Sequence, residues 1–326
     1  MRAPLLAVLV ISLYGIPAFA QHSNDGAHPP AATIASVTQN CKKFEGFYTF
    51  YYEDRTGKLF LEIDRFDREF LYFTSLPQGI GNGGAERGQA SAVIVKWIRA
   101  GAKVFLLQPN YEARSVNGSA AEQRDVTDAW SQSVLFGFSP VAVEGGKTLI
   151  DLTPFVVRDA LHIGETIGSG RANPGASFAA SAAGRSATST GAGYHFDESR
   201  SAVLIDNSRN FPKNTEFEAM ISFIGGGAGS GGGFRRGGAV APDPTCVTVR
   251  MHQSFAGLPD SGYQPRRFDP RSGFNSFSYL DFSAPMSEPL VRRFIERHRL
   301  KKKDPSAAVS EPVQPIVYYI DNGAPP

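Results

Sequence analysis

The 326-residue sequence holds only two cysteines, two tryptophans and four methionines, and its formal net charge is +2. It contains no H-E-x-x-H, no G-x-S-x-G and no Cys or His pair at metal-ligand spacing, so the short motifs of zinc peptidases and α/β-hydrolases are missing. The glycine motif Gly79-x-Gly81-x-x-Gly84 is followed by a predicted strand rather than a helix, which indicates a surface loop and no dinucleotide site. The near-neutral charge argues against a dedicated nucleic-acid-binding protein. We therefore assign no catalytic residue, no metal ligand and no cofactor to this chain.

Apolar and aromatic side chains are abundant and alternate along the chain. Hydrophobic residues make up 42% of the sequence, with 24 Phe, 11 Tyr and 34 Gly, which favours β structure with many turns. Leu59, Leu61 and Ile63 recur with the period of two that is typical of a half-buried strand. Further strands are predicted at 47–52, 70–74, 92–98, 104–107, 141–143, 149–152, 217–223 and 247–251. The sequence predicts a mainly β fold, an antiparallel meander, sandwich or barrel-like sheet with one or two short helices and Gly-rich loops.

The first 20 residues have the pattern of an export signal. Arg2 precedes an apolar run from Leu5 to Ile16, and small residues before Gln21 predict cleavage between Ala20 and Gln21. The alternative is an uncleaved anchor, but the run is short for a bilayer span. We expect an exported protein, periplasmic or secreted, without a transmembrane segment after cleavage, and a flexible leader over residues 21–43.

Export also changes how Cys41 and Cys246 are interpreted. Two cysteines in an oxidising compartment favour one disulfide over a metal site or a redox pair. The alternative is two free thiols, because the sequence does not show whether the two residues are close.

Three further segments have distinct patterns. Ser119 and Glu122 form a capping box before an apolar stripe that includes Trp130, so a helix is expected there, with Trp130 anchoring it on the sheet. Pro289 to His298 is predicted as a second helix and Ile316 to Ile320 as a last strand. Two low-complexity insertions, 167–193 and 225–242, are expected to be mobile.

A basic run lies near the end of the chain. It consists of Arg292, Arg293, Arg297, Arg299, Lys301, Lys302 and Lys303, with Glu296 as the one acid between them. Such a run is most often a solvated face or an interface to an acidic protein surface, and less often a contact with anionic lipid or nucleic acid. We take these seven residues as a candidate interface.

Five continuous segments carry a resemblance to a known family. They are DLTPFVVRD (151–159), FPKNTE (211–216), LPDSGYQPRRFDPRSG (258–273), RFIERHRLKKKDP (293–305) and PIVYYIDNGAP (315–325). Together they resemble the N-terminal region of large exported bacterial zinc-dependent metallopeptidases, in which an uncharacterised β-rich domain precedes a metzincin-like catalytic domain. The resemblance implies a β-rich domain over 44–284 and a junction with the first strand of a protease domain over 285–326. The family's zinc motif would follow the last segment, so zinc is expected only in that missing domain and the present chain is expected to be truncated before it.

The resemblance leads to a first hypothesis for function. The chain would be the non-catalytic N-terminal domain of an exported zinc metallopeptidase, inactive by itself, with the missing or separately encoded protease domain as its partner and peptides as candidate substrates. The alternative hypothesis is a stand-alone periplasmic binding module for peptide or glycan.

Overall fold

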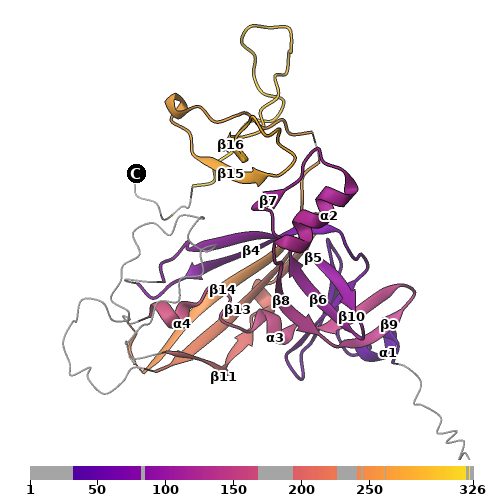
Figure 1. Cartoon of the computed structure of the whole chain (residues 1–326). Helices are drawn as coiled ribbons and strands as arrows, with labels where there is room; N and C mark the ends of the chain where they lie inside the picture. The colour runs from indigo at the N-terminus through magenta and orange to yellow at the C-terminus, as the bar shows by residue number, and fades with distance from the viewer. Residues whose placement is uncertain are drawn as a thin grey trace, which may run out of the picture. The chain divides into compact units, whose positions relative to one another are not determined.

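The alternating segments form strands, and the fold is mainly β with antiparallel sheets, as the sequence predicts. A computed structural model describes residues 32–81, 85–167, 194–225, 241–243, 245–260, 262–320 and 323. In these residues the strands form sheets of five, eight and three strands (Figure 1). Among the described helices, none combines the length and hydrophobicity that a bilayer span requires.

The five-stranded sheet has one face in the core and the other under a short helix. Its order is β1 (Lys42–Phe44), β2 (Thr49–Glu53), β3 (Lys58–Ile63), β10 (Lys147–Asp151) and β9 (Pro140–Glu144). Leu59 and Leu61 of β3 face the main core, whereas Phe60 packs with Leu149 and with Ile34 of helix α1 (Ile34–Thr38). Both faces of β3 are therefore buried, which explains its nearly continuous apolar sequence.

The eight-stranded sheet supplies most of the core. Its order is β11 (His195–Val203), β13 (Asn214–Ile224), β14 (Cys246–Gly257), β4 (Glu69–Gln78), β5 (Ala90–Ala100), β6 (Lys103–Gln108) and β8 (Ser133–Phe138), with β12 (Arg209–Phe211) beside β13. β4 and β14 lie side by side although they are far apart in the sequence (Figure 1). Phe255 of β14 is fully buried and its ring lies close to six other aromatic rings, those of Tyr48, Phe70, Tyr72, Trp97, Phe155 and Phe217.

The three-stranded sheet corrects one sequence prediction. It consists of β16 (Val291–Ile295), β15 (Ser276–Asp281) and the two-residue β7 (Ala113–Arg114). Residues 289–298 were predicted as a helix, and this prediction is wrong, because β16 pairs antiparallel with β15 over five residues. Val291, Phe294 and Ile295 are good strand formers, and cross-strand pairing outweighs the helical spacing of the apolar positions.

The remaining helices are short. They are α2 (Ala120–Ala129), α3 (Thr153–Val156), α4 (Ile163–Thr166) and the 3-10 turns η1 (Ile205–Asn207) and η2 (Pro270–Ser272). The predicted capping box of α2 is confirmed, since Ser119 and Glu122 each bond the other's backbone N–H. α2 buries no residue, and the Trp130 ring at its end packs with Phe282, the residue that follows β15, at 6.4 Å.

Two terminal segments also differ from expectation. The predicted leader is folded over residues 32–43. Thr33 caps α1, and Ile34, the first residue of α1, packs against Tyr51 of β2. Residues 316–320 were predicted as a strand, but they have no regular secondary structure. The expected signal peptide, with its cleavage site at Ala20 and Gln21, and most of both Gly-rich insertions lie outside the described residues.

Hydrogen bonds in one resemblance segment fix local turns, and hydrogen bonds beside a second one join the five-stranded sheet to the eight-stranded sheet. In the first, Asp151 accepts from Thr153 N at 3.0 Å, and Asp159 accepts from the backbone N–H groups of Ile163 and Gly164 at 2.8 and 2.9 Å. Around the second, the Asn210 amide donates to the carbonyls of Phe44 and Tyr48 at 2.9 and 2.7 Å.

The loop at Gly46 fits closely over Asn210. A Cβ at Gly46 would lie 2.1 Å from Asn210 Oδ1, so only glycine allows this loop to close on the eight-stranded sheet.

Candidate functional site

Most of the basic run is held by the chain's own polar groups. Arg292, whose side chain is 13% exposed, pairs with Asp281 at 3.4 Å and with Glu288 at 2.7 Å. Arg299 pairs with Asp260, and Lys302 donates to the carbonyls of Ala307 and Ala308 at 2.6 and 3.1 Å. These three cations are therefore engaged by groups of the chain itself.

The two other arginines of the run lie on aromatic rings of the loop 258–273. Arg293 lies 3.7 Å from the centre of the Phe268 ring and donates to Ser276 Oγ at 2.7 Å. Arg297 lies 5.2 Å from the Tyr263 ring and donates to the Gln264 carbonyl at 2.7 Å. Of the seven predicted interface residues, only Lys301 and Lys303 have exposed side chains without a hydrogen-bond or ion-pair partner in the part of the chain that is described.

Two resemblance segments thus form one substructure. Phe268 N donates to the Arg293 carbonyl at 2.9 Å, and Ile295 N donates to the Arg266 carbonyl at 3.0 Å. Between them, Arg267 forms an antiparallel bridge with Phe294. The segment 266–268 therefore lies beside β16 as an additional edge. A polar hollow of about 470 Å³, lined in part by Asn275, Glu296 and His298, opens at the end of β16.

A larger cavity, of about 620 Å³, lies between α1 and the outer face of the five-stranded sheet. Glu62, only 8% exposed, accepts from Tyr51 Oη at 2.9 Å and pairs with Lys147 at 2.7 Å. The hydrogen bond to Glu62 raises the pKa of Lys147, and burial raises the pKa of Tyr51. Lys43 and Glu144 complete the charged lining, so two acids and two lysines surround an apolar wall that includes Ile34. The cavity suits a ligand that is neutral or carries both signs of charge.

Cys41 lines this cavity, and Cys246 begins β14 in the other large sheet. Both are free thiols in the structure, which matches the alternative left open by the sequence rather than the disulfide. Burial, followed by the nearby Glu53 carboxylate, raises the pKa of the Cys41 thiol. A raised pKa makes the reactive thiolate form of Cys41 scarcer and slows its reactions.

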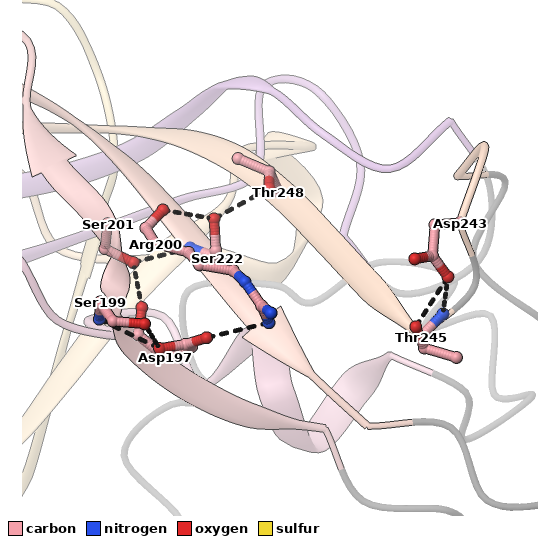
Figure 2. A network of polar contacts seen from close by, with 8 residues as sticks. All are labelled: Asp197, Ser199, Arg200, Ser201, Ser222, Asp243, Thr245 and Thr248. Atoms are coloured by element: carbon pink, nitrogen blue, oxygen red, sulfur yellow. Dashed lines mark hydrogen bonds and ion pairs between the residues drawn. The ribbon is translucent and has the colours of Figure 1, made fainter.

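The edge strand β11 contains a polar bulge (Figure 2). Its register to β13 shifts between Asp197 and Ala202, and the Asp197 carboxylate pairs with Arg200 at 3.1 Å and accepts from Ser199 Oγ at 2.6 Å. Ser222 of β13 donates to the Arg200 carbonyl at 2.7 Å. Figure 2 shows these groups pointing toward one another, so the Asp197 carboxylate and the Ser222 hydroxyl are engaged inside the bulge and help to hold the strand edge in place.

The structured histidines do not form a metal site. Nε2 of His252, on β14, lies 2.5 Å from Glu216 Oε2 of β13. Burial opposes ionisation of Glu216, but hydrogen bonds from His252, Asn214 and Ser254 outweigh it and lower the pKa of this carboxyl. Within the described ranges, no group of three or more His, Cys, Asp or Glu side chains is arranged to hold a metal ion.

The segment 316–320 exposes five consecutive large apolar side chains. Ile316, Val317, Tyr318, Tyr319 and Ile320 are between 42% and 95% exposed. A contiguous apolar run of this kind is unusual on a free surface and typical of a surface that contacts another protein.

The comparisons with known proteins assign most of this chain to one family. Residues 88–303 match the domain of unknown function DUF5117, and residues 31–79 match the domain of unknown function DUF5118. The chain belongs to the DUF5117 family. No curated protein and no solved structure matches the chain.

The DUF5117 and DUF5118 regions are not separate in the structure. The DUF5118 region supplies α1 and β1 to β4, but β3 pairs with β10 and β4 pairs with both β5 and β14 of the DUF5117 region. Each of the two large sheets thus contains strands from both regions. The cavity beside α1 likewise combines Tyr51 and Glu62 of the DUF5118 region with Glu144 and Lys147 of the DUF5117 region.

Proposed function

We propose that this DUF5117 chain is the non-catalytic N-terminal domain of an exported zinc-dependent metallopeptidase, active in the periplasm or outside the cell. The observation that carries the proposal is the exposed apolar run 316–320, which lies in a segment of the resemblance. A partner domain that covers these side chains would remove a large apolar area from water, at about 25 cal/mol per Å². The zinc ion and its ligands belong to that partner domain, and the present chain binds or guides the polypeptide.

The structural roles of three resemblance segments are also consistent with this proposal. Segments 151–159, 258–273 and 293–305 contribute caps, ion pairs and ring contacts that hold one arrangement of strands. A protease domain attached after residue 320 would sit beside the run 316–320.

Adding the partner domain separately tests the proposal. The catalytic domain of a full-length member of the resembled peptidase family is mixed with the chain, and binding is followed by sedimentation. We expect a complex that is weakened about tenfold or more by the double change Val317→Asp and Tyr319→Asp, because charges would be buried at the contact. The matched control is Val134→Asp, a 55% exposed position on β8, which should leave binding unchanged.

The zinc chemistry of the pure chain is checked in the same samples. We expect neither tight stoichiometric zinc binding nor cleavage of casein by the chain alone. Casein cleavage by pure chain, or equal binding by the double variant and the wild type, would contradict the proposal.

The cavity beside α1 favours a second candidate function, a module that binds a peptide or glycan. Its mixed charges suit a zwitterionic peptide, and Cys41 in its wall offers a reporter. In a Cys246→Ser variant, where Cys41 is the only thiol, tri-alanine or maltotriose should slow alkylation by iodoacetamide, and Glu62→Gln should reduce the protection because it removes the partner of Lys147. The reverse variant, Cys41→Ser, is the control, and its Cys246 should react at one rate with or without ligand. Unchanged Cys41 rates at millimolar ligand would reject this candidate.

A further inference from the structure

The three-stranded sheet has one face built from aromatic rings and arginine. Residues directly opposite in antiparallel strands share a face, so the pairs Phe277–Phe294 and Tyr279–Arg292 lie on the same side of the sheet. The Phe277 and Tyr279 rings lie 5.6 and 5.8 Å from the Phe294 ring, with interplanar angles of 25° and 15°. Arg267, which is bridged to Phe294, extends this face at the edge of the sheet. We call Phe277, Tyr279, Phe294 and Arg267 the aromatic–arginine face.

Two members of the aromatic–arginine face, Phe277 and Arg267, are exposed to solvent. Phe277 is 41% exposed and Arg267 is exposed, and neither the Phe277 ring nor the Arg267 guanidinium has a polar or charged partner in the described chain. Arg292, by contrast, is neutralised by Asp281 and Glu288. Arg114 is half-buried and packs on the Tyr279 ring at 4.3 Å, so Arg267 is the exposed cation of this face, beside a preformed aromatic stack.

The charge distribution indicates the sign of the partner. Residues 258–303 contain ten Arg or Lys against five Asp or Glu, a net charge of +5. That leaves 23 basic and 26 acidic residues in the rest of the chain, a net charge of −3. The near-neutral total thus conceals a basic region around the three-stranded sheet, which attracts a partner of negative charge.

We infer that the aromatic–arginine face is a docking surface for an acidic polypeptide, with a carboxylate on Arg267 and an aromatic or aliphatic side chain on the Phe277–Phe294 stack. Arginine and aromatic residues together are the usual centre of protein–protein contacts. Lipid headgroups and nucleic acid would need several free cations along a surface, whereas six of the ten cations in residues 258–303 are engaged by carboxylates, carbonyls or aromatic rings of the chain, namely Arg271, Arg292, Arg293, Arg297, Arg299 and Lys302. This surface differs from the run 316–320, so the inference goes beyond the proposed function and does not depend on a protease partner.

A defined acidic probe tests the inference. The full chain is titrated with a fluorescent random copolymer of Glu and Tyr, and with poly-Glu as the charge-only probe. We expect tighter binding of the Glu/Tyr copolymer and a loss of about tenfold for Phe277→Ala and for Arg267→Glu. Affinity should fall as salt rises, because part of it is electrostatic.

Two matched variants serve as controls. Phe211→Ala removes an exposed phenylalanine from β12, and Arg55→Glu reverses an exposed arginine between β2 and β3. Both should bind like the wild type, and the urea midpoint of every variant shows that it is folded. The inference is overturned if Phe277→Ala and Arg267→Glu bind like the wild type, if the controls lose as much affinity, or if phosphatidylglycerol vesicles or oligo-dT bind as tightly as the copolymer.

Discussion

Replacing Phe255 with alanine is expected to lower the free energy of unfolding by about 3–5 kcal/mol, the usual range for a fully buried phenylalanine. Phe255 is 0% exposed. Its ring lies 5.3 Å from Phe70, 5.7 Å from Phe217 and 5.9 Å from Trp97, in most cases edge to face. The substitution removes the contacts of this ring with Phe70 of β4, Phe217 of β13 and Trp97 of β5 at once. The remaining aromatic rings are rigid and fill the resulting cavity poorly.

Urea unfolding followed by tryptophan fluorescence measures this effect, because Trp97 lies against Phe255. Phe211→Ala is the matched control: this ring is 47% exposed, so its loss should change stability by less than about 1 kcal/mol. A Phe255→Ala variant within about 1 kcal/mol of the wild type would show that the core does not have the packing described above.

The strands of the core could be predicted from the sequence because their period is local. Leu59, Leu61 and Ile63, or Phe217, Ala219 and Ile221, recur at every second position, and all six side chains are buried in the main core, although the residues between them are largely buried as well. The pairing of β4 with β14 has no such local signal, because residues 69–78 and 246–257 are far apart in the sequence. Sheet order is decided by which faces pack together, and one sequence does not contain that information in a readable form.

The errors near the C-terminus have a related cause. Pro289, Leu290, Val291, Phe294 and Ile295 have helical spacing, but the same residues can form a strand when a partner strand is available, and β15 supplies one. β15 itself, Ser276–Asp281, has a mixed polar and aromatic sequence that gave no strand signal. Because β15 was not predicted, β16 had no partner strand, and the spacing of its own apolar residues indicated a helix.

The candidate sites, like the strands, could be predicted only where the signal is local in the sequence. Counting charges locates the basic run, but only the structure shows that Phe268, Tyr263 and Asp260 engage three of its arginines. The aromatic–arginine face depends on the register of β15 to β16, and the cavity beside α1 depends on Glu62 meeting Lys147 from another strand. A buried glutamate in an apolar strand, such as Glu62 between Leu61 and Ile63, is the one sequence signal that could have pointed to that cavity.

Asp281 is the polar centre of the three-stranded sheet, and Asp281→Asn is expected to destabilise the protein by about 2 kcal/mol at pH 7. The carboxylate accepts from Ser283 Oγ at 2.6 Å, from Val116 N at 3.3 Å and from Arg292 Nε at 3.4 Å. An amide keeps the shape but loses the charge, and its NH₂ group faces donors. The bonds to Val116 and Arg292 link the segment before α2 to β16, so their loss should loosen this sheet first.

The stability difference between Asp281→Asn and the wild type should depend on pH. Burial alone would raise the pKa of Asp281, but hydrogen bonds from Ser283, Val116 and Arg292 outweigh it and hold the pKa below its ordinary value. A carboxyl whose pKa is lower in the folded state stabilises the fold fully above its unfolded pKa of about 3.9, and this contribution is lost as the pH falls through the folded pKa. The difference of about 2 kcal/mol at pH 7 should therefore shrink as the pH falls below about 4, where the unfolded wild-type chain begins to take up the proton, and the charge contribution is gone below the folded pKa, where the native group is neutral as well. Urea midpoints of both proteins from pH 7 to pH 3 measure it, with Asp54→Asn, an exposed partner of Lys42, as the control that changes little throughout. A difference that stays constant over this range would mean that the charge of Asp281 does not contribute to the stability of the sheet.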